Sequence, residues 1–126
     1  MNSNHTVVDS VQIPAMETGH SQVQFIGTPE MIGSNSMAVI LGTVPGPGMV
    51  HLHSHADPEC FYILDGEMEV YQESSGKDKW TQLKKGYFAA IHGNVKHAWR
   101  NTSSCPCGLL SSQAETFMRV SAEHAN

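Results

Sequence analysis

Apolar residues follow a short-period pattern along most of this chain, in runs separated by glycine, proline and polar turn residues. Alternation in the segment 22–27 predicts a strand, and the continuous apolar run 37–44 predicts a strand buried on both faces. Asp65-Gly66, a strong hairpin signal, divides the segment 59–72 into two strands. Further strands are expected at 49–55, 79–85, 87–92, 95–101 and 108–113.

Roughly nine short strands, with turns between them and no internal repeat, predict an all-β fold of the double-sheet jelly-roll type. Residues 21–112 would form this barrel. Residues 1–20 are interpreted as an N-terminal arm that could add a strand around 8–13, and 28–36 as a loop. The segment 113–126 contains the one predicted helix, a short C-terminal one.

Composition places the chain among globular proteins, since 40% of its 126 residues are hydrophobic and 15% are charged. A net charge of −5 and scattered Lys and Arg residues argue against binding to nucleic acid. No apolar run approaches the ~20 residues of a membrane span, and the N-terminus lacks the features of a signal peptide. Three cysteines do not make a disulfide framework, so we expect a cytoplasmic protein.

The segment 49–59 concentrates residue types that bind metals, with His51, His53 and His55 at alternate positions and Glu59 close behind. Alternate side chains of a strand share one face, and imidazole with carboxylate suits a first-row divalent ion. An exposed face with functionless histidines is the alternative. Against it, the neighbouring strands are apolar, and burying these groups costs free energy unless they gain partners. The alternation alone does not decide which of the histidines would bind.

One stretch of the chain resembles the first sequence motif of the cupin superfamily, G-x5-H-x-H-x3,4-E-x6-G. His53 and His55 are followed at the motif's spacing by Glu59 and Gly66. Pro47 stands where the opening glycine is usual.

A second stretch resembles the other cupin motif, G-x5-P-x-G-x2-H-x3-N. Gly86, His97 and Asn101 match it in register. His92 replaces the proline and Asn94 replaces the second glycine, a mild change because asparagine tolerates left-handed backbone. Together the motifs are similar to those of small bacterial single-domain cupins, including quercetin-dioxygenase-like ones. The resemblance implies a double-stranded β-helix, the cupin jelly-roll barrel, and a homodimer.

The resemblance also implies a ligand set for one divalent transition metal ion, which could be Fe, Mn, Ni, Cu or Zn. Its members would be His53, His55, Glu59 and His97. A choice of His51 with His53 would leave five residues before Glu59, outside the motif's spacing. We therefore expect His51 beside the metal, facing its ligands or the substrate, and Glu59 could double as a general base.

Large apolar side chains are expected around this centre. Met49 lies on the face of the histidine run, Phe61 and Ile63 alternate along the next strand, and Trp99 shares the face of His97. Each alone would be ordinary barrel core. Together they predict an apolar cavity that binds a planar or hydrophobic small molecule.

These expectations favour a metal-dependent, dioxygenase-like enzyme acting on a small aromatic or enolisable molecule. Two open positions on an octahedral ion would accept a bidentate oxygen ligand or O2. A non-redox isomerase, lyase or cyclase on the same site is the first alternative. A non-catalytic module that binds a ligand or a metal is the second.

Overall fold

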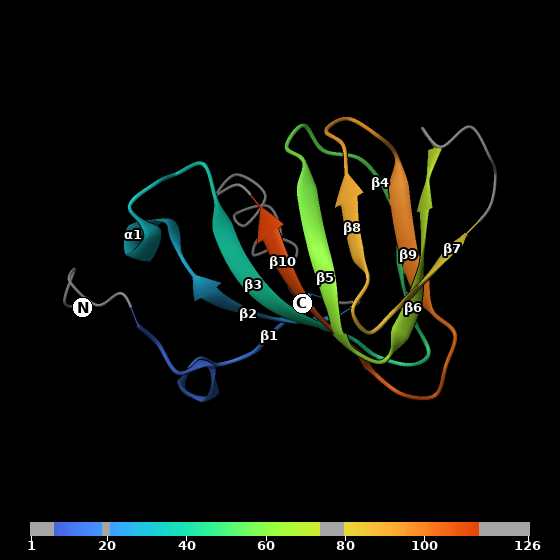
Figure 1. Ribbon diagram of the computed structural model, residues 1–126, viewed down its shortest axis with the longest axis horizontal. Helices are drawn as coiled ribbons and strands as arrows, with labels where there is room; N and C mark the ends of the chain where they lie inside the picture. The colour runs from blue at the N-terminus through green and yellow to red at the C-terminus, as the bar shows by residue number, and fades with distance from the viewer. Residues whose placement is uncertain (1–6, 19–20, 74–79, 114–126) are drawn as a thin grey trace.

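The protein consists of two antiparallel β-sheets (Figure 1), and this computed structural model describes residues 7–18, 21–73 and 80–113. Six strands form one sheet in the order β1-β2-β3-β10-β5-β8, and four form the other in the order β4-β9-β6-β7. The strands are β1 (Met16–Glu17), β2 (Gln22–Gly27), β3 (Ala38–Val44), β4 (Gly48–His53), β5 (Glu59–Asp65), β6 (Glu67–Gln72), β7 (Thr81–Lys84), β8 (Phe88–Ile91), β9 (His97–Asn101) and β10 (Cys107–Gln113).

The predicted all-β jelly roll is confirmed, and β3 shows how the sequence produces it. This strand lies between β2 and β10 in the larger sheet. Its alternate residues Ala38, Ile40 and Val44 are buried on the inner face. Val39 and Leu41 are only half-buried on the outer face, so the expectation of burial on both sides holds for one face.

The hydrophobic core lies between the sheets, and the turn at Asp65-Gly66 joins them. β5 belongs to the larger sheet and β6 to the smaller one, so the predicted hairpin pairing of these two strands is wrong. Gly66 has a φ of +76°, and a Cβ atom there would lie 2.5 Å from the carbonyl oxygen of Pro106. Glycine is therefore required at this turn. The buried core residues are Val44, Phe61, Ile63, Met68, Val70, Leu83, Ala89, Ile91, Cys107 and Leu109.

The N-terminal arm differs from the expected strand at 8–13. A short 3-10 helix, Ser10–Gln12, occupies that segment, and the Asp9 carboxylate accepts a hydrogen bond from the Val11 amide at its start. The arm does add a strand, but later: β1 pairs with β2. Because a carboxylate before two free amide groups stabilises a helical turn, Asp9 favours the observed conformation.

The expected loop at 28–36 contains one short helix, α1 (Pro29–Ile32). The Thr28 hydroxyl accepts a hydrogen bond from the amide of Met31, and Gly33 ends the helix in the left-handed conformation. These are ordinary start and stop signals, and the sequence interpretation overlooked them because only four residues separate them.

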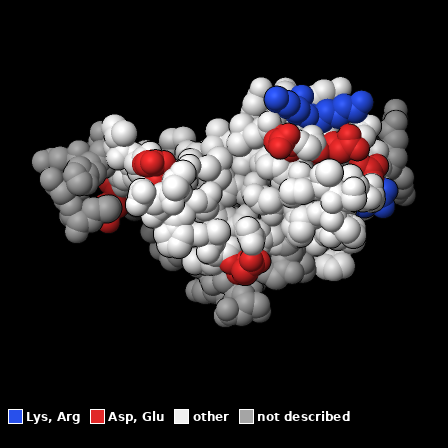
Figure 2. Space-filling view, turned by 90° about the horizontal axis from the view of Figure 1, so that it is seen from below, with Lys and Arg blue, Asp and Glu red and all other residues white. Residues whose placement is uncertain are grey.

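Gln113 still belongs to β10, and the rest of the expected C-terminal helix, 114–126, lies outside the described residues. Among the described residues, no helix has the length and apolar character needed to cross a bilayer. On the face shown in Figure 2, Lys and Arg side chains lie beside acidic ones and form no broad basic surface. Arg100 and Glu69 form an ion pair, with a 2.9 Å contact between Nε and Oε1.

Candidate metal centre

Three histidine side chains converge between the ends of two neighbouring strands. His53 is the last residue of β4, His97 is the first of β9, and the two are paired in register. His55 lies in the turn after β4, so it is placed by that turn rather than by strand alternation. One ring nitrogen from each imidazole lies within 4.8 Å of the others. The residues could therefore share one ion.

Backbone carbonyl groups fix how these imidazoles are oriented. The Nδ1 atoms of His53, His55 and His97 lie 2.7, 2.7 and 2.8 Å from the carbonyl oxygens of His51, Asp57 and Val95. A carbonyl oxygen only accepts, so each Nδ1 carries the proton, and in the neutral ring each Nε2 offers a lone pair. Such backbone contacts are the usual second partner of a metal-binding histidine.

His97 gives the clearest sign that a group is needed here. Its side chain is fully buried, and its Nε2 atom has no hydrogen-bond partner. The Glu59 carboxylate lies 3.4 Å away, an ion-pair contact without hydrogen-bond geometry. A buried lone pair without a partner is costly, and a metal ion would satisfy it.

Glu59 brings a carboxylate to the same point. It is 4% exposed, and its Oε1 lies 3.2 Å from the Nε2 of His55 and 3.4 Å from that of His97. Ligands about 2.1 Å from one ion are separated by about 3.0–3.4 Å in octahedral or tetrahedral geometry. The observed separations match, so these residues fit a first-row divalent ion.

The charge states also suit such an ion. Burial raises the pKa of Glu59, but contacts with His55 and His97 outweigh it, and the net pKa is lowered. Burial lowers the pKa of His53 and keeps that ring neutral. Burial opposes protonation of His55 as well, yet its hydrogen bond with Glu59 raises the pKa overall. Glu59 is therefore ionised, which is the form in which a carboxylate binds a metal.

The turn at Gly93-Asn94, in the second motif, packs against the segment that carries His55. The amide of Asn94, a residue with φ of 63°, donates a 2.7 Å hydrogen bond to the His55 carbonyl oxygen. A Cβ atom on Gly93 would collide with the carbonyl oxygen of Ala56. The two motifs thus pack backbone to backbone, which explains the glycine at 93 and the tolerance for asparagine at 94.

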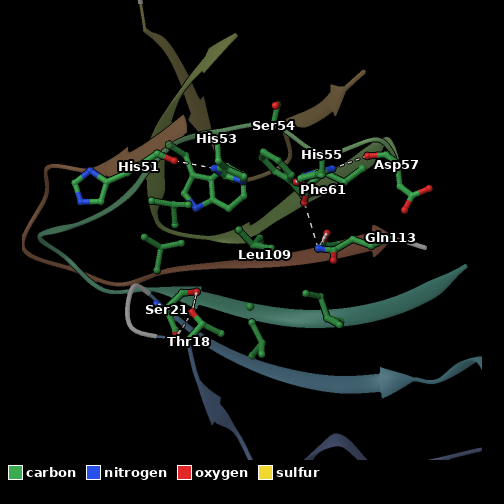
Figure 3. Close-up of a pocket in the computed structure, with 18 of the residues that line it drawn as sticks. Thr18, Ser21, His51, His53, Ser54, His55, Asp57, Phe61, Leu109 and Gln113 are labelled. Carbon is green, nitrogen blue, oxygen red and sulfur yellow. Dashed lines mark hydrogen bonds and ion pairs between the residues drawn. The ribbon is translucent and has the colours of Figure 1, made fainter. Parts of the chain in front are cut away.

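A cavity of about 660 Å³ opens beside the three histidines, between the two sheets (Figure 3). Phe61 and Trp99 meet edge to face at 5.5 Å on its wall. Residues of the larger sheet cover the side opposite the histidines. The cavity surface is mostly apolar. Besides His51, His53, His55 and Glu59, its polar lining residues are Thr18, Ser21, Thr43, Ser54, Asp57, Ser111 and Gln113.

Of the residues predicted to line this cavity, Phe61 and Trp99 do so, whereas Met49 and Ile63 do not. Ile63 is fully buried in the hydrophobic core. Met49 is displaced by an irregularity in β4, where Val50 pairs with Trp99 but His53 pairs with His97. One extra residue therefore reverses the alternation, and Val50 takes the inward position.

His51 also lies in this bulge. It is exposed at the rim of the cavity (Figure 3), and its carbonyl oxygen, rather than its imidazole, accepts the hydrogen bond from His53. His51 therefore lies at the rim of the cavity, and its backbone carbonyl oxygen helps to orient the imidazole of His53.

Two polar residues of β10 were missed by sequence reasoning. The Nε2 of Gln113 donates to Glu59 Oε2 at 3.2 Å and to Ser111 Oγ at 2.8 Å. Both side chains are buried, at inward positions that continue from Cys107 and Leu109. Two polar residues on the inward alternation of the last strand were the signal that could have revealed them.

The comparison with known families supports this arrangement of fold and site. The sequence profile described as "Cupin domain" matches residues 40–112, more than half of the chain. No curated protein matches the chain in sequence.

Several solved structures share the fold. A protein described as a predicted oxalate decarboxylase from Thermotoga maritima superposes with a TM-score of 0.73 at 21% identity, over 86% of this chain and 97% of that one. The polyketide cyclase RemF from Streptomyces resistomycificus gives 0.75 at 17%, over 86% and 78%. A sugar phosphate isomerase of the cupin superfamily from Silicibacter pomeroyi gives 0.70 at 15%, over 86% and 74%. At these identities the similarity establishes the fold alone.

Proposed function

This chain belongs to the cupin family, and we propose that it is a mononuclear metal-dependent enzyme of dioxygenase type. Its substrate would be a small aromatic or enolisable molecule bound in the cavity. The observation that carries the proposal is the cluster of three imidazole nitrogens within 4.8 Å of one another, at the wall of a cavity of about 660 Å³.

His53, His55, Glu59 and His97 would hold the ion. Three neutral imidazoles and one carboxylate leave a divalent ion with a net charge near +1, which suits an anionic oxygen ligand such as an enolate. A bound Fe, Mn, Ni or Cu ion supplies Lewis acidity and access to O2 chemistry. With Zn the four residues would complete a tetrahedral shell, which favours a structural role.

The cavity wall supports a planar, largely uncharged substrate. Phe61 and Trp99 present aromatic rings, and no Lys or Arg is among the described residues that line the cavity. A strongly anionic substrate would be expected to meet a bidentate arginine. Trp99 also has a buried Nε1–H without a partner, which an oxygen atom of the substrate would accept.

Glu59 would have two tasks in this proposal. Its Oε1 faces the imidazoles, and its Oε2 is held by Gln113. The lowered pKa keeps it ionised, so it can bind the metal and accept a proton from an enolisable substrate that displaces it. Gln113 fixes the carboxylate so that one oxygen stays directed at the centre.

The test is turnover by protein loaded separately with Fe, Mn, Ni, Cu and Zn, on a panel of enediols, flavonols and 1,3-diketones, with and without oxygen. Oxygen-dependent loss of substrate that disappears in His97→Ala is expected. Equal turnover without oxygen would replace the dioxygenase with an isomerase, lyase or cyclase. Full activity in metal-free protein would overturn both versions.

We further propose that the protein is a cytoplasmic homodimer that pairs through the outer face of the larger sheet. Leu110, Tyr62 and Phe88 stand side by side in register across three strands and are 36%, 43% and 64% exposed. Such an apolar row is typical of a surface that a partner covers. The three cysteines are free, which suits a reducing compartment.

A further inference from the structure

Within the described part of the chain, three buried side-chain polar atoms have no hydrogen-bond partner: His97 Nε2, Trp99 Nε1 and Gln113 Oε1. All three belong to the centre or to the wall of the cavity beside it. The proposed metal accounts for the first. Gln113 Oε1 is an acceptor that the proposed metal does not satisfy. Gln113 is only 6% exposed, so bulk water does not supply the missing donor either.

The Gln113 amide can adopt only one orientation. Its Nε2 donates to the carboxylate of Glu59 at 3.2 Å and to the hydroxyl of Ser111 at 2.8 Å. A flipped amide would place oxygen against the carboxylate, where two acceptors repel each other. Oε1 is therefore directed away from Glu59 and still requires a donor.

Ser111 supplies a donor next to this acceptor. Its side chain is 2% exposed, and its Oγ accepts the hydrogen bond from Gln113. Among the described residues no acceptor is found for its own hydrogen. The amide oxygen of Gln113 (labelled in Figure 3) and the hydroxyl hydrogen of Ser111 thus offer one acceptor and one donor side by side on β10, and both residues line the cavity.

We propose that Gln113 determines specificity by accepting a hydrogen bond from a hydroxyl group of the substrate, with Ser111 donating to the same hydroxyl oxygen. This inference rests on the proposed function, because the rest of the substrate is bound to the metal. The substrate class narrows to planar oxygen chelators that carry a further hydroxyl adjacent to the chelating pair. A hydroxyl suits the site because it both donates and accepts.

In the simpler alternative, Gln113 only positions the Glu59 carboxylate. Its Nε2 holds Glu59, and this contact alone would explain an effect of substitution on metal affinity. The two roles differ in what they discriminate. Positioning changes the affinity for every chelator alike, whereas recognition changes the ratio between chelators with and without the added hydroxyl.

Catechol and pyrogallol form the probe pair, since pyrogallol is catechol with one more adjacent hydroxyl. Their dissociation constants are measured by calorimetry without oxygen, on Ni(II)-loaded wild type, Gln113→Met and Ser111→Ala. Ser112→Ala, which changes the half-buried neighbour on the other face of β10, is the matched control. Metal saturation is verified for each protein, so that altered metal affinity does not enter the ratio.

We expect wild type to prefer pyrogallol, with a ratio about tenfold higher than that of Gln113→Met, since an unpaired buried acceptor is satisfied. Ser111→Ala should lower the ratio by roughly threefold, and Ser112→Ala should leave it unchanged. Equal ratios in wild type and Gln113→Met would overturn the inference and leave Gln113 as a positioning residue. If no protein retains Ni(II), the metal-dependent function itself fails, which is a separate outcome.

Discussion

Asn101 ends β9 and carries four hydrogen bonds with its side chain while only 1% exposed. Its Nδ2 donates to the carbonyl oxygens of Val44 at 3.2 Å and Cys105 at 2.7 Å. Its Oδ1 accepts from the amide and the hydroxyl of Ser103 at 3.0 and 2.7 Å. The residue thus ties the loop after β9 to the end of β3, a role that the motif alone did not suggest.

Asn101→Ala removes these hydrogen bonds and takes one donor from the buried carbonyl group of Val44. At about 1 kcal/mol for each hydrogen bond, the free energy of unfolding should fall by about 4 kcal/mol. That is a large part of the 5–15 kcal/mol typical of a domain and corresponds to a drop in Tm of roughly 15 °C. Urea and thermal unfolding of metal-free protein, followed by circular dichroism, measure both.

Two comparisons sharpen this prediction. Asn101→Asp keeps the acceptor but places a second oxygen against the carbonyl oxygens of Val44 and Cys105, so a loss at least as large as that of Asn101→Ala is expected, while exposed Thr102→Ala should change little. Metal affinity should stay near that of wild type, because Asn101 and His97 lie at opposite ends of β9, about 13 Å apart. A loss below about 1 kcal/mol in Asn101→Ala would refute the reasoning that these hydrogen bonds stabilise the fold.

Three further predictions concern other parts of the molecule. Gly93→Ala should lower metal affinity roughly 10- to 100-fold by displacing the turn that carries His55, whereas Gly108→Ala, with no atom nearer than 4.0 Å, should not; metal titration decides. Burial, with nearby acidic groups, raises the pKa of Cys107 from 9.0 to about 11. A raised thiol pKa stabilises the folded state below pH 9.0, and this is lost as the pH rises toward about 11. The free energy of unfolding, measured at intervals between pH 9.0 and about 11, should decline by up to about 3 kcal/mol, and this decline should be absent in Cys107→Ala. Phe88→Asp should convert the dimer to a monomer in sedimentation, and a monomeric wild type would rule out the proposed interface.

The sequence predicted the β-architecture well because period-two alternation and turn residues are local signals. β3 and the turn at Asp65-Gly66 were recognised for that reason, whereas the pairing across that turn was not, because the strands on its two sides enter different sheets. The 3-10 helix Ser10–Gln12 and α1 were missed. Each spans about one turn, which is too short to show a repeating pattern of apolar residues. Elements of that length depend on individual side-chain hydrogen bonds rather than on a repeated pattern.

The neighbours at the site could be predicted only in part. Spacing and resemblance placed His53, His55, Glu59 and His97 together. In the structure the three imidazoles converge, and Glu59 contacts two of them, His55 and His97. The bulge in β4, which moves Met49 out of the cavity lining and Val50 into it, leaves no mark in the hydrophobic pattern.

The contact between Gln113 and Glu59 could not be predicted for a different reason. It joins strands far apart in sequence, and only the closed barrel creates it. Alternation along β10 could have shown which way the Gln113 side chain points, but not which residue it contacts. Metal binding itself stays a prediction that rests on geometry and on the chemistry of the donor atoms.

The most direct test of the account is the metal content of the purified protein, measured by elemental analysis on wild type, His97→Ala and His92→Ala. His97 is fully buried at the centre, whereas His92 is an exposed histidine of the adjoining turn and serves as the matched control. With all three proteins verified as folded, wild type and His92→Ala should each retain about one divalent transition metal ion per chain, and His97→Ala should retain almost none. Equal metal content in wild type and His97→Ala, or a folded wild type that binds no such ion even when reloaded, would contradict the metal centre described above.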